Sequence, residues 1–368
     1  MAVSASSETL PVRVAPVDGD AAIVVRDLVK RYRVERRRRG SMAWLRSFLA
    51  PTFEDVLALD GVSFSIGRGE IVGLLGPNGA GKSTTVKIMC GVLHPTSGEV
   101  CVLGRDPHRR RVANAQDIGV LFGHRSHLIY ELPAIDSFRF LRAVYQIDDA
   151  TYERNLARLV DVLELGSLQG QMVRTLSLGQ RMRCEVAATF LHGPRVVYLD
   201  EPTIGLDVNA KRIIRAFIRS LVDEFGTTVV LTTHDLADIE ELCERVILID
   251  HGHLVYDGEL RRLRERYAHS KTVQAELPVE ARERVTATIM AAAPEAQVAT
   301  LGSLLRATQL GGERNVMDVA RAMLADPDVS NLTITEPRVE EIIGNVFQEG
   351  AVPAAGAALA DVAAARPA

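Results

Sequence analysis

Short runs of apolar residues recur along the chain, separated by polar and glycine-rich segments. Runs of about four to eight residues are typical of buried strands, whereas helices need longer segments. The predicted strands cover residues 22–25, 62–66, 70–75, 99–103, 118–122, 196–199 and 228–233, and residues 246–256 predict a hairpin. The core of the protein is therefore expected to be a sheet.

A helical period replaces this pattern at about residues 136–191. Apolar side chains there recur with the spacing of one helix face, at Tyr152, Leu156, Leu159, Val160 and Leu163. We interpret this region as a helical subdomain beside the sheet.

Residues 271–348 are expected to form a separate small α+β domain. Strand-like segments at 272–277 and 332–335 accompany two amphipathic helices, the first of which is expected to begin after an Asn315 cap. The apolar faces of the two helices comprise Val316, Val319, Ala320, Met323 and Leu324, and Val339, Ile342, Ile343, Val346 and Phe347. The domain contains no catalytic pattern.

The length of 368 residues leaves room for about two domains. Both ends, residues 1–20 and 349–368, are expected to be disordered, and neither a signal peptide nor a membrane-spanning run of about 18 apolar residues is recognised. The net charge of −4 gives no general case for a nucleic-acid partner, so none is expected. The four cysteines form no paired motif and predict buried free thiols in a reducing compartment.

The segment Gly76–Thr84, with the sequence GPNGAGKST, lies between a predicted strand and a predicted helix. In this context it matches the P-loop, in which backbone N–H groups and a helix N-terminus hold phosphates. Lys82 is expected to reach the β- and γ-phosphates, and the Ser83 hydroxyl is expected to ligate Mg²⁺. The alternative is a glycine-rich turn without a ligand, which the Lys82-Ser83 pair disfavours.

Ionisable side chains follow two of the predicted strands. Asp200 and Glu201 come after the strand at 196–199, and His234 comes after the strand at 228–233. Open α/β sheets place ligands at the carboxyl ends of their strands, so a site is expected here. Ser177 and Gln180 have the spacing of a capping box, which explains both residues structurally.

Two features ahead of the P-loop have two interpretations each. Tyr32 either stacks on an adenine or is a half-buried strand tyrosine. The insert at residues 33–57 contains four consecutive arginines, Arg36 to Arg39, followed by an amphipathic segment at 42–49. It either contacts a membrane surface or membrane-protein partner, or is a solvated loop whose helix caps the domain's own core.

The P-loop, Leu176–Gln180, Asp200-Glu201, Gly205-Leu206-Asp207 and His234 follow one another in this order. This order resembles the ATPase subunits of ATP-binding cassette (ABC) transporters over residues 21–265. The resemblance implies an α/β P-loop NTPase fold, with a RecA-like parallel-sheet core, an antiparallel β subdomain and a helical subdomain. Residues 271–348 resemble the short C-terminal extension of some exporter-type members, with dimer contact or regulation as the roles considered.

The resemblance also implies roles for individual residues. Asp200 matches the aspartate that holds Mg²⁺, Glu201 the general base, and His234 the histidine that contacts the γ-phosphate. Asp207 matches the loop that couples two sites across a dimer. Nucleotide contacts are implied for Tyr32, Gly76, Pro77, Asn78, Gly79, Ala80, Gly81, Lys82, Ser83 and Thr84. The signature that completes the partner subunit's site comprises Leu176, Ser177, Leu178, Gly179 and Gln180.

By the same resemblance, a head-to-tail homodimer, or a pseudo-symmetric dimer of two such subunits, hydrolyses two ATP with Mg²⁺ and drives separate transmembrane permease subunits. The protein is then peripheral to the cytoplasmic face of the membrane. Residues 177–183 and the basic insert resemble a bacterial exporter subgroup, so export is expected. A ribosome-associated ABC ATPase would carry two cassettes, whereas this chain has one. A DNA-associated, SMC-like ATPase would need a long coiled coil between Lys82 and Ser177, where fewer than 100 residues lie.

Two positions depart from the family's pattern. His124 stands where the family has a glutamine that senses Mg²⁺ and the transmembrane partner. Its imidazole is expected to bond to a metal-bound water, and activity is expected to fall as the pH drops toward about 6. Leu178 replaces a usual glycine, but the flanking Ser177, Gly179 and Gln180 match, so function is expected to be kept.

Overall fold

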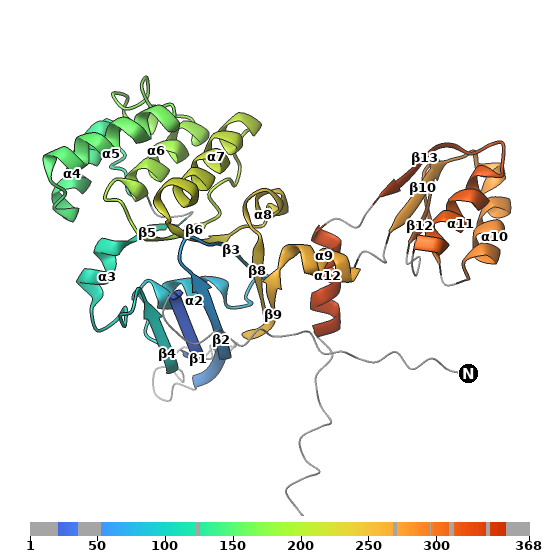
Figure 1. Cartoon of the computed structure of the whole chain (residues 1–368), viewed down its shortest axis with the longest axis horizontal. Coiled ribbons are helices and arrows are strands. Elements are labelled where there is room, and N and C mark those ends of the chain that lie inside the picture. The colour runs from blue at the N-terminus through green and yellow to red at the C-terminus, as the bar shows by residue number, and fades with distance from the viewer. Residues whose placement is uncertain are drawn as a thin grey trace, which may run out of the picture. The chain divides into compact units, whose positions relative to one another are not determined.

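The computed structural model describes residues 21–35, 53–122, 126–267, 271–294, 296–308, 313–335 and 339–350. The chain divides into two compact units, residues 1–260 and 261–368 (Figure 1). The finer bounds expected from the sequence, 21–265 and 271–348, stay a prediction. No helix in the described ranges is long and apolar enough to cross a membrane.

A six-stranded sheet forms the centre of the first unit, with the order β5-β6-β7-β3-β8-β9. Its strands are β3 (Ile71–Leu75), β5 (Ile118–Leu121), β6 (Val196–Asp200), β7 (Thr228–Thr232), β8 (Arg245–Asp250) and β9 (His253–Glu259). The first five in this order are parallel, and β9 pairs antiparallel with β8 as the predicted hairpin. Parallel strands end at one edge of the sheet, so the segments after β3, β6 and β7 come together there.

A second, antiparallel sheet has the order β2-β1-β4 and consists of β1 (Ala21–Glu35), β2 (Phe53–Gly67) and β4 (Ser97–Val102). It packs with α2 (Lys82–Met89) and the central sheet into one apolar cluster that includes Ile23, Phe64, Met89 and Tyr198. The insert that we expected at residues 33–57 is shorter than predicted at both ends. Residues 33–35 and 53–57 belong to the paired strands β1 and β2. The remainder of the insert, residues 36–52, lies outside the described residues.

Helices cover the side of the central sheet away from this second sheet (Figure 1). They are α4 (Ala134–Tyr145), α5 (Asp149–Val162), the short turn η1 (Val173–Thr175), α6 (Leu178–Phe190) and α7 (Val208–Phe225). The first four confirm a helical region near residues 136–191. We did not predict α7, although its buried residues have a clear helical period. Two further short helices of this unit are α3 (Arg111–Asp117) and α8 (Leu236–Leu242), whereas α9 (Leu260–Tyr267) begins at its last residue and continues into the second unit.

The second unit contains a four-stranded antiparallel sheet with the order β11-β12-β10-β13. Its elements are β10 (Thr272–Glu276), η3 (Val279–Ala281), α10 (Arg282–Ala292), β11 (Gln297–Leu301), β12 (Leu304–Thr308), α11 (Glu313–Leu324), β13 (Ser330–Thr335) and α12 (Val339–Gly350). The order β-α-β-β-α-β from β10 to β13 is the ferredoxin-like arrangement.

Several expectations for this unit need correction. Asn315 does not cap α11, because the helix already begins at Glu313. We did not predict α10, β11 and β12. The expected tail at 349–368 begins inside α12, which ends at Gly350, and residues 351–368 lie outside the described residues.

Candidate functional site

The glycine loop between β3 and α2 is shaped by close backbone contacts. A Cβ atom at Gly76 would lie 2.0 Å from the carbonyl oxygen of Ile249 at the end of β8. Gly81 has φ +113, and a Cβ there would lie 2.7 Å from the carbonyl oxygen of Ala58 in β2. The loop therefore needs glycine at both positions, and α2 begins directly behind it at Lys82. Its backbone N–H groups and the helix N-terminus can hold an anion.

Lys82 is bound to its own loop. Its Nζ atom donates hydrogen bonds to the carbonyl oxygens of Gly76, at 2.5 Å, and Pro77, at 3.0 Å. Burial lowers the pKa of Lys82, while the carboxylates of Glu201 and Asp200 act in the opposite direction. The structure thus brings the loop lysine into the field of the two acidic residues that follow β6.

The ends of β6 and β7 form the acidic side of the site. The backbone N–H of Glu201, which has φ +58, donates to the carbonyl oxygen of Thr232 at 2.8 Å. The Thr232 hydroxyl donates to the Asp200 carboxylate. His234 Nε2 lies 3.3 Å from Glu201 Oε1, with the Glu201 side chain 20% exposed and that of His234 56% exposed. These contacts bring together three of the residues that sequence reasoning selected.

Burial raises the pKa of Glu201 above its usual value of 4.5. The neighbouring His234 opposes this rise, both through charge and through a hydrogen bond from its backbone. A carboxylate with a raised pKa is a better proton acceptor, and Glu201 can therefore act as a general base.

A buried carboxylate connects the two strand-end segments, and sequence reasoning missed it. Asp238 is fully buried in α8 and accepts hydrogen bonds from the hydroxyls of Thr203, two residues after Glu201, and Thr233, next to His234. The Thr233 bond measures 3.2 Å, and Arg215 Nε of α7 donates to the other Asp238 oxygen at 2.7 Å. In the sequence, the feature that could have indicated this role is an acidic residue next to Ile239 on the apolar face of a short helix.

The signature segment begins α6 with a complete capping box. The Ser177 hydroxyl accepts from the Gln180 N–H at 3.3 Å, and the Gln180 side chain accepts from the Ser177 N–H at 2.9 Å. The predicted capping box is confirmed. Leu178 is 45% exposed, and Ser177 is exposed beside it.

The signature adjoins the loop before α7 within the same chain. Asp207 caps α7, since its carboxylate accepts from the Ala210 N–H at 2.9 Å. A Cβ atom at Gly205 would lie 3.2 Å from Leu178 Cδ2, and one at Gly179 would lie 3.1 Å from the Ala210 Cβ. Among the described residues, no hydrogen bond or ion pair links the signature segment to the glycine loop. One chain therefore presents the loop and the signature as separate surfaces.

Tyr32 of β1 lies beside the start of α2. Its hydroxyl is 3.4 Å from Thr84 Oγ1, and Lys30 Nζ is 5.2 Å from the centre of its ring. The side chain is half-buried, which fits both interpretations of Tyr32, so stacking on an adenine stays a prediction. His124 lies outside the described residues, and its role also stays a prediction.

Comparison with known proteins relates this site to one family. The sequence pattern of the ABC transporter family matches residues 59–204. The "Probable multidrug ABC transporter ATP-binding protein YbhF" of Escherichia coli is 37% identical over 223 residues, 61% of this chain and 38% of YbhF. The chain thus spans less than two fifths of that relative's length. The "ABC transporter ATP-binding protein NatA" of Bacillus subtilis is 32% identical over 210 residues, 57% of this chain and 85% of NatA.

A solved structure shares the fold. The "Dimeric structure of a post-hydrolysis state of the ATP-binding cassette MJ0796 bound to ADP and Pi" has a TM-score of 0.53 and 26% identity. The similarity covers 65% of this chain and 99% of the cassette. Together with the strand order of the central sheet, it confirms the predicted P-loop NTPase fold.

Proposed function

Because the chain belongs to the family of ABC transporter ATP-binding proteins, we propose that it binds and hydrolyses ATP to drive a separate membrane permease. The observation that carries the proposal is the meeting of Lys82, Glu201 and His234 at one edge of the sheet. Phosphoryl transfer to water needs phosphate binding, charge neutralisation and an oriented water, and these groups supply all three.

The glycine loop binds the phosphates. Its N–H groups and the N-terminus of α2 surround the β- and γ-phosphates. Lys82 exchanges its bonds to the carbonyl oxygens of Gly76 and Pro77 for bonds to the phosphates. The Tyr32 ring contacts the base, a role supported by the position of its hydroxyl 3.4 Å from Thr84 Oγ1.

Ser83 and Asp200 are the residues that fit Mg²⁺. Both offer oxygen atoms, which this cation prefers, and Thr232 orients the Asp200 carboxylate. The Ser83 hydroxyl is exposed and bonds to no other described residue. When bound, Mg²⁺ neutralises charge on the β- and γ-phosphates.

Glu201 activates the attacking water. Its raised pKa favours accepting a proton. The hydrogen bond from its backbone N–H to the Thr232 carbonyl oxygen holds the main chain from which the carboxylate extends. His234, 3.3 Å away, orients the carboxylate and contacts the γ-phosphate.

Two chains complete each site. The signature has no link to the glycine loop of its own chain, and its exposed helix N-terminus can face the γ-phosphate held by a second copy. The two-fold arrangement is also supported by the dimer of the MJ0796 cassette. Asp207, next to the signature, lies where it can transmit the state of one site to the other.

The permease binds the helical region. Large apolar side chains are exposed on α4, at Phe140 and Val144, and on the paired segments beside its start, at Tyr130, Leu132 and Met172. Exposed apolar groups of this kind favour a protein partner. Export is the proposed direction, because YbhF is described as a probable multidrug transporter protein. The protein then lies at the cytoplasmic face of the membrane, held there by its permease.

The test is Glu201→Gln. The variant keeps ATP binding but lowers turnover by about 100- to 10,000-fold, because the isosteric amide accepts no proton. It accumulates as an ATP-bound dimer, measured by light scattering after gel filtration. Glu153→Gln on α5 is the control and leaves both measurements unchanged.

Rapid hydrolysis by Glu201→Gln would remove Glu201 as the base. Purification of the wild-type chain from detergent-solubilised membranes tests the partner. A polytopic membrane protein is expected to co-purify, whereas ribosomes would support the non-transport alternative.

A further inference from the structure

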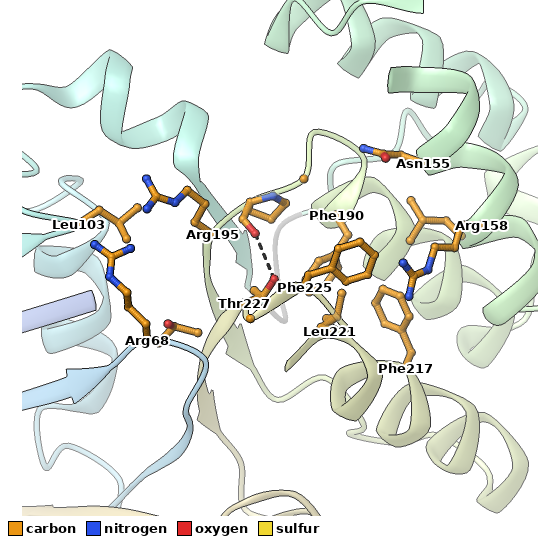
Figure 2. A pocket seen from close by; sticks show the side chains of 15 residues that line it. Arg68, Leu103, Asn155, Arg158, Phe190, Arg195, Phe217, Leu221, Phe225 and Thr227 are labelled. Atoms are coloured by element: carbon orange, nitrogen blue, oxygen red, sulfur yellow. Dashed lines mark hydrogen bonds between the residues drawn. The ribbon is translucent and has the colours of Figure 1, made fainter. Parts of the chain in front are cut away.

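A pocket lies at the edge of the central sheet where β6 and β7 begin, opposite the edge that carries the glycine loop. Figure 2 shows the side chains that line this pocket. Its volume is about 370 Å³, within the usual range for small-molecule sites. It is lined by residues that precede β6 and begin β7, such as Arg195 and Thr228, and by the ends of α6 and α7. Asn155 and Arg158 of α5, and Arg68 and Leu103 from the antiparallel sheet side, complete its walls.

One wall of the pocket is aromatic. Phe190 and Phe217 are buried, and their rings meet edge to face with centres 5.0 Å apart. Leu159 and Leu221 extend this wall. Phe225 stands at its rim, with the Arg158 guanidinium 3.9 Å from the ring centre. Phe225 is 55% exposed, so it is the ring that a flat apolar group can cover and remove from water, whereas Phe190 and Phe217 are already buried behind it.

The charged groups of the pocket have one sign. Among the described residues, its lining includes Arg68, Arg158 and Arg195 but no aspartate or glutamate. Arg158 is paired with Glu224, which lies outside the lining. Arg195 is exposed, and its side chain has no hydrogen bond or ion pair to any described residue. In Figure 2, Arg68 and Arg195 lie on the side of the pocket away from the phenyl rings.

We propose that this pocket is a binding site for a small amphipathic anion. The flat apolar body lies against the exposed ring of Phe225. The carboxylate, sulfonate or phosphate group is bound by Arg195 and Arg68, because guanidinium groups form paired hydrogen bonds to such anions.

The position of the pocket connects it to the candidate site. Phe190 ends the helix that the signature begins, and Phe225 ends the helix that Asp207 caps. Arg195 precedes the strand that ends at Asp200. A ligand here contacts the far ends of the elements that position the ATP site, so we expect it to change ATP turnover. This consequence rests on the proposed function, whereas binding itself does not.

The experiment compares two probes by calorimetry on the full chain: naphthalene-2-sulfonate and its neutral counterpart naphthalene-2-sulfonamide. The sulfonate is expected to bind about tenfold more tightly, since only it can pair with the guanidinium groups. Arg195→Gln should reduce this difference, because only Arg68 then remains to bind the sulfonate, while sulfonamide binding stays unchanged. Arg154→Gln removes the same charge from an exposed residue of α5 that does not belong to the pocket lining, and it should have no effect.

Three results would overturn the proposal: no binding of the sulfonate, equal affinity for the two probes, or unchanged sulfonate affinity in Arg195→Gln. Because Arg195 is exposed, its variant is expected to fold, and circular dichroism verifies this. Turnover measured with saturating sulfonate is a separate readout. If binding follows the predictions but turnover does not change, the site stands and its coupling to ATP hydrolysis is absent.

Discussion

The glycine loop and the signature segment are held in place by different kinds of contact. The loop is packed against strands distant in sequence, with Gly76 against Ile249 of β8 and Gly81 against Ala58 of β2. The signature is held by two bonds between Ser177 and Gln180, three residues apart. The loop therefore depends on the assembled core, whereas the signature has local support and leaves Ser177 and Leu178 exposed, as the proposed contact with a second chain requires.

The largest expected effect concerns the loop. Lys82→Ala removes the only side-chain cation of the loop, and ATP affinity should fall by about 100-fold or more. The α2 helix has a second lysine, Lys87, and Lys87→Ala is the matched control. Affinity is measured with a fluorescent ATP analogue on the isolated chain. Normal binding or turnover by Lys82→Ala would refute the phosphate-binding assignment.

Ser177→Asp separates the local role of the signature from its proposed role in a dimer. Aspartate is as good an N-cap as serine, so thermal stability should stay within about 0.5 kcal/mol of wild type. Its charge would face the γ-phosphate held by the partner, and turnover should fall by about tenfold or more. Ser177→Ala is expected to affect stability more than turnover, with the free energy of unfolding lowered by about 1 kcal/mol.

Both measurements use the same preparation, with unfolding followed by circular dichroism and hydrolysis by phosphate release. Full turnover by Ser177→Asp would mean that the signature is only a helix cap. Unchanged ATP affinity of the isolated chain is expected in both variants, because among the described residues no hydrogen bond or ion pair joins the signature to the loop of its own chain.

The difference between local and distant contacts also decides what the sequence could predict. The capping box at Ser177 and Gln180 and the strand–loop–helix order around Lys82 are local patterns, and both were predicted. The α7 helix was missed despite a clear apolar period. By contrast, the burial of Asp238 depends on hydrogen bonds from Thr203, 35 residues away, and from Arg215, 23 residues away. The pocket combines positions from Arg68 to Thr228, and no local pattern indicates such a meeting.

The role of Asp238 is tested by Asp238→Asn, which keeps the size but removes the charge that faces Arg215. We expect the free energy of unfolding to fall by about 1–3 kcal/mol, because buried donors lose a charged acceptor. Turnover at saturating ATP should fall several-fold while ATP affinity stays unchanged, since Asp238 positions Glu201 and His234 and contacts no phosphate. A loss of stability with unchanged kcat would reduce Asp238 to a structural residue. Asp223→Asn on α7 is the control.

The smallest expected effect is a shift in pH dependence. The base must be ionised, and burial raises the pKa of Glu201, so turnover is lost as the pH falls through a value above 4.5. His234 opposes that rise. His234→Ala should therefore move the acid limb of the pH–rate profile to higher pH, besides lowering turnover.

His124→Gln distinguishes the two candidate origins of this acid limb. If protonation of His124 causes the fall in activity toward about pH 6, the variant shifts the limb to lower pH, and an unchanged profile would discard that hypothesis. If ionisation of Glu201 alone determines the acid limb, the limb shifts in His234→Ala and stays unchanged in His124→Gln. Both profiles are measured as kcat at saturating ATP, so that changes in ATP binding do not enter. If the acid limb moves in neither variant, it belongs to another titrating group, and the raised pKa of Glu201 plays no part in the mechanism. The position of Glu201 beside Lys82 would then be the remaining support for its role as the base.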